Sequence, residues 1–218
     1  MGRVTHRTLE NFFRQFRLAR YKKGEVILHA GDPPPGIFYL KSGFIRLYSI
    51  SEEGEEFTHS IFQKGDCLPL IWAMGNMENW HNLEAMTEVE TWRAPKDRFL
   101  KFIKSKPELL TILMRVTLTR FASLLVRMEH LVFGNARAKV ASILYLLGKW
   151  VSKKRGQKII IKVPLTHKDI ASLVGLARET TSIEIKKLED EGLISNQKGI
   201  LVIKNLNKLK KESFINSF

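Results

Sequence analysis

The acidic and sulfur-containing side chains are the first candidates for chemistry in this sequence. Four carboxylates, those of Glu52, Glu53, Glu55 and Glu56, crowd around one glycine, and paired acids can perform general acid–base catalysis. The chain has a single cysteine, Cys67, and contains no Gly-rich phosphate loop, HExxH motif or nucleophile elbow. It also lacks the His-x-His pair that a cupin-like metalloenzyme needs. The acids therefore fit an exposed hairpin turn, and we expect no enzyme, no metal site and no cofactor.

Basic side chains are more informative, because they gather in one half of the chain. The 218 residues contain 36 Lys and Arg against 22 Asp and Glu, a formal net charge of +14. Residues 1–105 carry 15 basic and 13 acidic side chains, whereas residues 106–218 carry 21 and 9. A concentrated positive charge attracts polyanions, of which nucleic acid is the most common, although a solvated lysine-rich face has the same composition.

The compartment follows from the cysteine count and from hydropathy. A single cysteine excludes a disulfide framework or a four-cysteine metal site within one chain and fits a reducing cytoplasm. The first residues, MGRVTHRTLENFFRQF, are charged and lack the apolar run of a signal peptide. No stretch reaches the roughly 18 consecutive apolar residues of a membrane span. We expect a cytoplasmic protein without membrane contact.

Two kinds of pattern divide the chain. Between residues 21 and 95, regularly placed glycines separate the β-rich runs EVILHA, GIFYLKSG, FIRLYSI and EEFTHSIF. Short strands between turn residues are typical of an antiparallel sandwich or barrel. The run DPPPG at 32–36 predicts a loop, because proline cannot donate to a strand ladder. From Lys96 onward the pattern is helical, so the sequence predicts an α+β protein.

The longest predicted helix, Pro107–Gly134, carries apolar residues that alternate by four and three positions. This is the a/d spacing of a helix that pairs with a copy of itself. The predicted dimer seam consists of Leu110, Met114, Thr117, Phe121, Leu124, Met128 and Leu131. A second apolar set is expected to pack on the chain's own sheet: Leu113, Leu118, Leu125 and Val126. The alternative is a long helix buried within one subunit.

The last third of the chain has the spacing of a winged helix-turn-helix. A helix over Ala136–Val151, a basic connector over Ser152–Lys158 and a short strand, IIIKVPL, precede it. Thr166 and Asp169 can form a capping box, Gly175 permits a tight turn, and a second helix starts near Ala177. Two β runs around NQKG at 196–199 then predict a hairpin, or wing. Many buried helix pairs share this spacing, so the pattern alone does not establish DNA binding.

Three parts of the chain together match a known family: YKKGEVILHAGDPPPGIFYLKSGFIRLY, the long helix, and LVGLARETTSIEIKKLEDEGLI. With these stretches the sequence resembles the bacterial Crp/Fnr superfamily of transcription regulators over nearly its whole length. The last stretch is close to the helix-turn-helix signature of the family. The resemblance implies three parts. They are an effector-sensing, cyclic-nucleotide-binding-like antiparallel jelly roll over residues 1–106, a dimerisation helix over 107–134, and a winged helix-turn-helix DNA-binding domain over 135–218.

The resemblance also implies which residues contact DNA. In the family motif, bases are read by an Arg-Glu pair at the start of the recognition helix and by the third and fourth positions after that Glu. The matching residues are Arg178, Glu179, Ser182 and Ile183. Ile183 stands where the cyclic-AMP branch has a second guanine-reading arginine, so it would meet a thymine methyl group or, alternatively, face the protein core. The other residues expected at DNA, mainly along phosphates, are Thr166, His167, Lys168, Thr180, Lys186 and Lys198.

The phosphate cassette of the cyclic-AMP branch is missing. That branch uses a Gly-Glu-Leu stretch and a downstream Arg-Ser pair, where this chain has GDCLPL at 65–70 and NWHN at 79–82. No arginine occurs from Lys64 to Trp92, although a partly dry phosphate site needs a cation or several aligned donors. We therefore expect no cyclic-nucleotide binding. The candidate residues for a different effector pocket are Asp66, Cys67, Trp72, Trp80 and His81.

Other sensor types of the family have little support. An iron–sulfur cluster needs several cysteines, and haem needs an axial ligand, for which His59 and His81 are the candidates. Cys67 fits a redox switch or a small buried residue. Core packing also explains the tryptophans and methionines of the roll.

These patterns together predict a homodimeric, sequence-specific regulator that binds palindromic double-stranded DNA. A small molecule other than cyclic AMP is expected to gate it, and RNA polymerase is a candidate partner. The alternative is a roll-type ligand-binding or protein-interaction module whose basic half binds protein rather than DNA.

Overall fold

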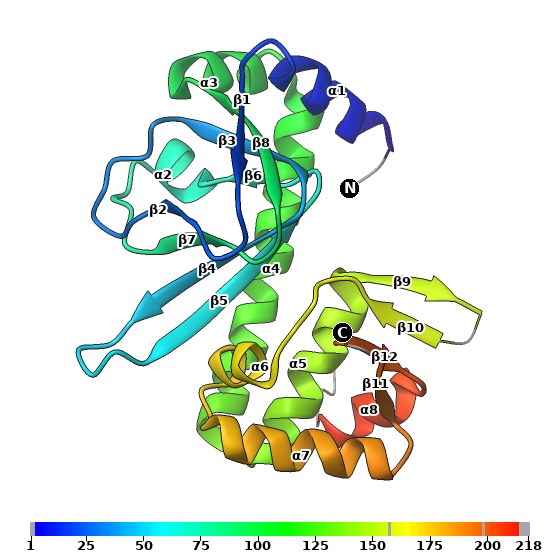
Figure 1. Cartoon of the computed structure of the whole chain (residues 1–218). Coiled ribbons are helices and arrows are strands. Elements are labelled where there is room, and N and C mark those ends of the chain that lie inside the picture. Colours follow the sequence, from blue (N-terminus) through cyan, green and yellow to red (C-terminus); the bar gives the residue numbers. More distant parts are fainter. Residues whose placement is uncertain (1–2, 157, 198, 214–218) are drawn as a thin grey trace. The chain divides into compact units, whose positions relative to one another are not determined.

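The computed structural model describes residues 3–156, 158–197 and 199–213, which fold as two compact units (Figure 1). The first unit comprises the residues up to Gly54 together with His59–Arg120. The second comprises Glu55–Thr58 together with the chain from Phe121 onward.

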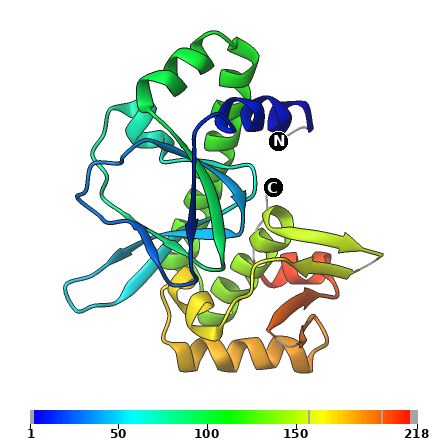
Figure 2. The same ribbon diagram turned by 45° about the horizontal axis from the view of Figure 1, so that its top comes forward.

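Two four-stranded sheets form the roll of the first unit (Figure 2). The first sheet has the order β1 (Arg17–Tyr21), β8 (Val89–Ala94), β3 (Ile37–Ser42) and β6 (Cys67–Leu68). The second has the order β2 (Val26–Leu28), β7 (Asn82–Ala85), β4 (Phe44–Ile50) and β5 (Glu56–Gln63). The predicted β-rich runs therefore became strands. Glu52, Glu53 and Glu55 lie in the exposed turn between β4 and β5, as predicted, whereas Glu56 is half-buried at the start of β5.

Two apolar cores explain why β3 is buried on both of its faces. Phe38 and Leu40 belong to one core, together with Ile45, Leu68 and Leu83. The alternate residues Ile37 and Tyr39 belong to the other core, because successive side chains of a strand point to opposite faces. That second core is completed by four helices: α1 (Arg3–Phe13), the short helix α2 (Leu70–Gly75) that follows β6, α3 (Lys96–Lys104) and the start of α4 (Pro107–Phe133).

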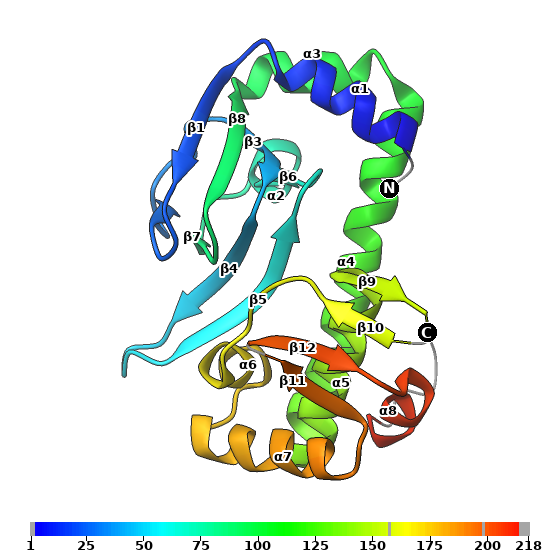
Figure 3. The same cartoon turned by 45° about the vertical axis from the view of Figure 1, so that its right-hand side comes forward.

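The second unit is built around α5 (Ala136–Trp150), whose residues from Val140 to Gly148 are buried. A four-stranded sheet has the order β11 (Ile194–Gln197), β12 (Ile200–Ile203), β10 (Lys158–Ile161) and β9 (Ser152–Arg155) (Figure 3). The remaining helices are α6 (His167–Val174), α7 (Arg178–Asp190) and α8 (Leu206–Glu212). The predicted winged helix-turn-helix is thus present.

The predicted fold class is confirmed, and one local prediction is wrong. In the segment 152–158, expected to be a basic connector, Ser152–Arg155 forms β9 and Lys158 begins β10. Gly156 has a φ of +61°, which allows the chain to reverse there. The connector therefore adds a hairpin to the sheet of the wing.

Candidate DNA-binding surface

A capping box fixes the start of α6, as the sequence predicted. Thr166 Oγ1 accepts a hydrogen bond from Asp169 N, and the Asp169 carboxylate accepts one from Thr166 N at 2.7 Å. Thr166 Oγ1 also donates to that carboxylate at 2.6 Å. These bonds satisfy backbone N–H groups that have no partner inside the helix, so α6 begins at a defined residue.

The turn after α6 depends on Gly175. Its backbone is left-handed, with φ 61° and ψ 45°, and its N–H donates to Ala171 O. An added Cβ would lie 3.3 Å from the Leu131 side chain, so the turn leaves little space for another residue. The chain then enters α7 at Arg178, one residue after the predicted start.

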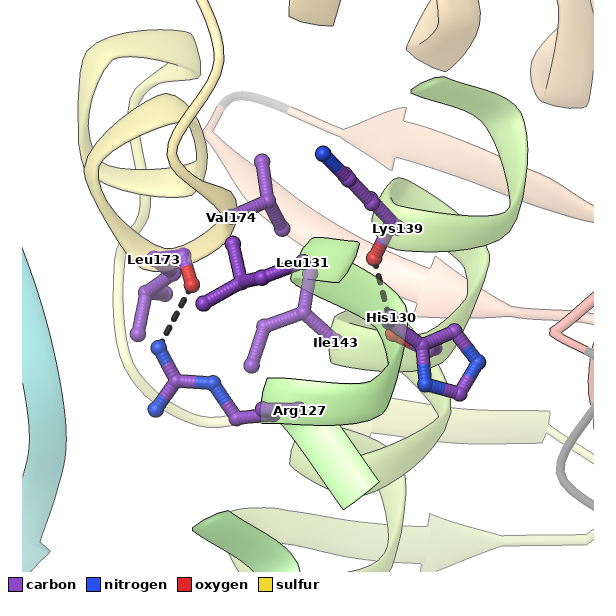
Figure 4. Close-up of a pocket in the computed structure, with 8 residues that line it drawn as sticks. Arg127, His130, Leu131, Lys139, Ile143, Leu173 and Val174 are labelled. Atoms are coloured by element: carbon purple, nitrogen blue, oxygen red, sulfur yellow. Dashed lines mark hydrogen bonds between the residues drawn. The ribbon is translucent and has the colours of Figure 1, made fainter. Parts of the chain in front are cut away.

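Arg127 supports the other end of α6 from the long helix α4. Its guanidinium donates to Leu173 O, in the last turn of α6, at 2.5 Å (Figure 4). It also donates to Thr58 O at 2.8 Å. The side chain is buried, and this burial lowers the pKa of Arg127 to about 10. A cation at a helix C-terminus is favourable, because the free carbonyl groups carry negative partial charge. Sequence reasoning missed Arg127, since its acceptors are backbone atoms far along the chain.

One face of α7 packs inside the unit and the other faces solvent. Thr181, Ile185 and Leu188 are fully buried, as predicted for the face that packs on the first helix. Arg178 and Glu179 are exposed, and Ile183 is 55% exposed, so the alternative in which Ile183 faces the protein core is wrong. Residues three and four positions apart on a helix are neighbours. The exposed side chains of α7 therefore lie on one surface together with Lys186. An exposed isoleucine among charged residues suits contact with an apolar group.

The other predicted DNA contacts surround this face. Lys168 and Thr166 are exposed at the start of α6, and Thr180 is half-buried. Ser182 and His167 are half-buried and hydrogen-bond to each other. The wing turn is held by the Asn196 side chain, which accepts from Gly199 N at 3.0 Å. Lys198 lies outside the described residues.

Six exposed apolar residues of α4 form a continuous stripe with four- and three-residue spacing. They are between 44% and 72% exposed, and we call them the α4 stripe: Met114, Leu118, Phe121, Leu125, Met128 and Val132. Phe133, at the end of the helix, is 86% exposed and lies outside this spacing. The prediction that Leu118 and Leu125 pack on the sheet is therefore wrong. The predicted seam shares three residues with the stripe, whereas Leu110, Leu124 and Leu131 are half-buried and Thr117 is exposed. Within the described residues, α4 is also the one helix long and apolar enough to cross a membrane.

The roll residues predicted for an effector pocket lie in several environments. Asp66 pairs with Arg120 of α4 at 2.7 Å, and Cys67 is buried, which raises the pKa of its thiol. Trp72 packs against the same apolar core as Cys67, whereas Trp80 is 58% exposed.

His81 contacts the ring of His59, with ring centroids 4.6 Å apart, and burial lowers the pKa of His81. In the described ranges, no three His, Cys, Asp or Glu residues are grouped as a metal site would need.

A roll, a long helix and a winged helix-turn-helix with an exposed charged recognition face define a DNA-binding transcription regulator. Residues 18–106 match the cyclic nucleotide-binding domain family, and residues 138–212 match the Crp-like helix-turn-helix domain family. The chain belongs to the Crp/Fnr superfamily of transcription regulators.

Individual relatives match over most of their length. The global nitrogen regulator of Nostoc sp. is 24% identical over 88% of this chain and 90% of its own. The cAMP-activated global transcriptional regulator CRP of Salmonella typhimurium is 26% identical over 91% and 95%. Among solved structures, a CooA mutant from Carboxydothermus hydrogenoformans is 25% identical, with a TM-score of 0.75 over 93% of this chain and 90% of that one.

Proposed function

We propose that this chain is a cytoplasmic homodimer that binds a palindromic DNA operator and responds to a ligand other than cyclic AMP. The observation that carries the proposal is the solvent face of α7, where Arg178, Glu179 and Ile183 stand together on a helix whose opposite face is buried, after the capped helix α6. A helix presented in this way fits the major groove.

Base reading follows from the chemistry of the three side chains. Arg178 can donate two hydrogen bonds to O6 and N7 of guanine, and Glu179 can accept from N4 of cytosine. Ile183 has only apolar atoms, and the apolar feature of the major groove is the thymine methyl group. Each half-site should therefore contain a G·C pair opposite the Arg178–Glu179 pair and a T·A or A·T pair opposite Ile183.

Phosphate contacts supply most of the affinity in this proposal. Within the described part of the chain, no ion pair occupies Lys168, Arg178 or Lys186, so their charges are available to DNA. Residues 106–218 carry 21 basic and 9 acidic side chains, which gives this part the positive charge that attracts a duplex. His167, Thr180 and Lys198 are proposed to lie along the same backbone.

A second copy of the chain is the proposed occupant of the α4 stripe. Spacings of four and three place its six residues on one side of the helix, as in a two-stranded coiled coil. Insertion of α4 into a membrane is the alternative, in which lipid would surround all sides of the helix. Arg115, Arg120 and Arg127 interrupt its apolar sequence, and charged side chains are energetically costly in a membrane. A symmetric dimer would present two α7 helices to the two halves of a palindromic site.

Two features argue against cyclic AMP as the effector. Pro69 precedes α2 and has no N–H group, so it removes one backbone donor where the cyclic-AMP branch has a phosphate-binding stretch. The nearby guanidinium of Arg120 is paired with Asp66. Asp66, Cys67, Trp72, Trp80 and His81 remain the proposed effector-responsive residues of the roll.

Selection of bound sequences from a random DNA pool tests the proposed function. The purified protein is used alone and again with a small-molecule cell extract, because the comparison reveals a ligand requirement. A palindromic consensus with G·C and A·T positions in each half-site is expected. Failure to enrich any sequence under both conditions would support the alternative module that binds protein instead of DNA.

A further inference from the structure

A polar contact joins the first residue of α6 to the first half of α7. His167 Nδ1 lies 2.8 Å from Ser182 Oγ, and Ser182 Oγ donates a hydrogen bond to Arg178 O, also at 2.8 Å. The family motif instead makes Ser182 a base reader. Both roles draw on the same hydroxyl group, so the hydrogen-bonding capacity of that group decides between them.

Counting protons assigns a direction to each of these bonds. A serine hydroxyl carries one proton, and a carbonyl oxygen can only accept. Ser182 therefore donates its one proton to Arg178 O. The short contact with His167 then requires that Nδ1 of the ring carries a hydrogen and donates it. Ser182 is left with no proton to donate to guanine or thymine. One of its two lone pairs accepts from His167, and the other belongs to a half-buried side chain, so little capacity to accept from a base remains.

The bond also supplies a constraint that the apolar contacts between α6 and α7 do not. Buried residues such as Ile170 and Ile185 hold the two helices together, but apolar packing is not directional. A hydrogen bond weakens steeply as its angle departs from linearity, so the His167–Ser182 bond opposes rotation of α7 about its own axis. Rotation of α7 would move the exposed Arg178, Glu179 and Ile183 together.

We propose that Ser182 is a positioning residue that reads no base, and that His167 holds it so that the rest of the α7 face meets the groove at a fixed angle. This inference rests on the proposed function and deepens it. It restricts direct reading to Arg178, Glu179 and Ile183.

Ser182→Ala, His167→Ala and the double variant test the pairing on the selected operator. Loss of the His167–Ser182 hydrogen bond in Ser182→Ala should weaken binding about fivefold. His167→Ala also loses its proposed phosphate contact and should weaken binding more. Both variants should keep the same base preferences at every position of a repeated selection. In the His167→Ala background, Ser182→Ala should change affinity by less than about twofold, because coupled residues are not additive. Ser182→Thr keeps the hydroxyl and should bind as the wild type does. Arg178→Ala is the matched control and should relax the preference at one base pair.

Two results would overturn the inference. One is a relaxed preference at a single base pair in Ser182→Ala, and the other is an equal loss in the presence and absence of the His167 side chain. A readout without DNA separates this failure from failure of the proposed function. Nitrogen NMR of the His167 ring should show hydrogen on Nδ1 in the neutral wild-type ring and a changed signal in Ser182→Ala. Hydrogen on Nε2 in the wild type would contradict the inference even if no DNA were bound.

Discussion

Replacing the central residue of the α4 stripe should dissociate the proposed dimer. Phe121 is 57% exposed in the single chain, so about half of its surface is available to a second copy. Complete burial of a phenylalanine contributes about 1.5–3 kcal/mol, so the exposed half contributes roughly 1–1.5 kcal/mol for each chain. The symmetric pair then loses about 2–3 kcal/mol on truncation. Phe121→Glu additionally places two carboxylates against each other in an apolar contact, which costs several kcal/mol more.

The expected total exceeds about 3 kcal/mol, which corresponds to a dimer dissociation constant at least about a hundredfold larger. Sedimentation equilibrium of Phe121→Glu and wild type over a range of concentrations measures this constant. Arg115→Glu is the control, because it is exposed on the same helix, lies outside the stripe and changes the charge by more. Equal dissociation constants for wild type and Phe121→Glu would refute the assignment of the stripe to a second copy.

Three further predictions concern DNA and the effector. Affinity for the operator should fall on the order of a hundredfold or more between low and moderate salt, because several phosphate contacts release counterions. A flat response to salt in a fluorescence titration would contradict phosphate binding. Calorimetric titration with cyclic AMP should give no heat of binding, since Pro69 offers no donor and Arg120 is paired, and micromolar binding would disprove this. Ile183→Arg should shift one base pair of each half-site from T or A towards G in a repeated selection, because arginine donates to O6 and N7 of guanine. An unchanged consensus would show that Ile183 reads nothing.

Local signals in the sequence predicted the parts of the site that depend on neighbouring residues. The Thr166–Asp169 capping box and the left-handed Gly175 need only residues within a few positions, and both are present as expected. The buried face of α7 followed from helical spacing in the same way. Such features depend on residue types and spacings within a few positions, which the sequence displays directly.

The register of the long helix could not be predicted so well, because α4 carries apolar residues on several sides. The predicted seam and the α4 stripe share Met114, Phe121 and Met128 and differ by one position between them, as in Thr117 against Leu118. Both sets have the four- and three-residue spacing, so the spacing does not choose between them. A shift of one position rotates the side chain about 100° around the helix axis, which changes the face it lies on. Only packing on the rest of the chain decides which set stays exposed.

Contacts between distant residues were also beyond the sequence. Arg127 binds backbone carbonyl groups of Thr58 and Leu173, and the hydroxyl of Ser182 is held by His167. Neither bond leaves a pattern in the spacing of residue types. The strand β9 was missed because its Lys-rich segment lacks the apolar alternation that marks a strand.

Methylation interference on the selected operator tests most directly whether α7 reads the major groove. Methylation of guanine N7 before binding blocks the atom that Arg178 is proposed to contact. We predict that one guanine in each half-site interferes with binding of the wild type, and that this interference alone disappears in Arg178→Ala. The same interference pattern in both proteins, or none at any guanine, would contradict the account.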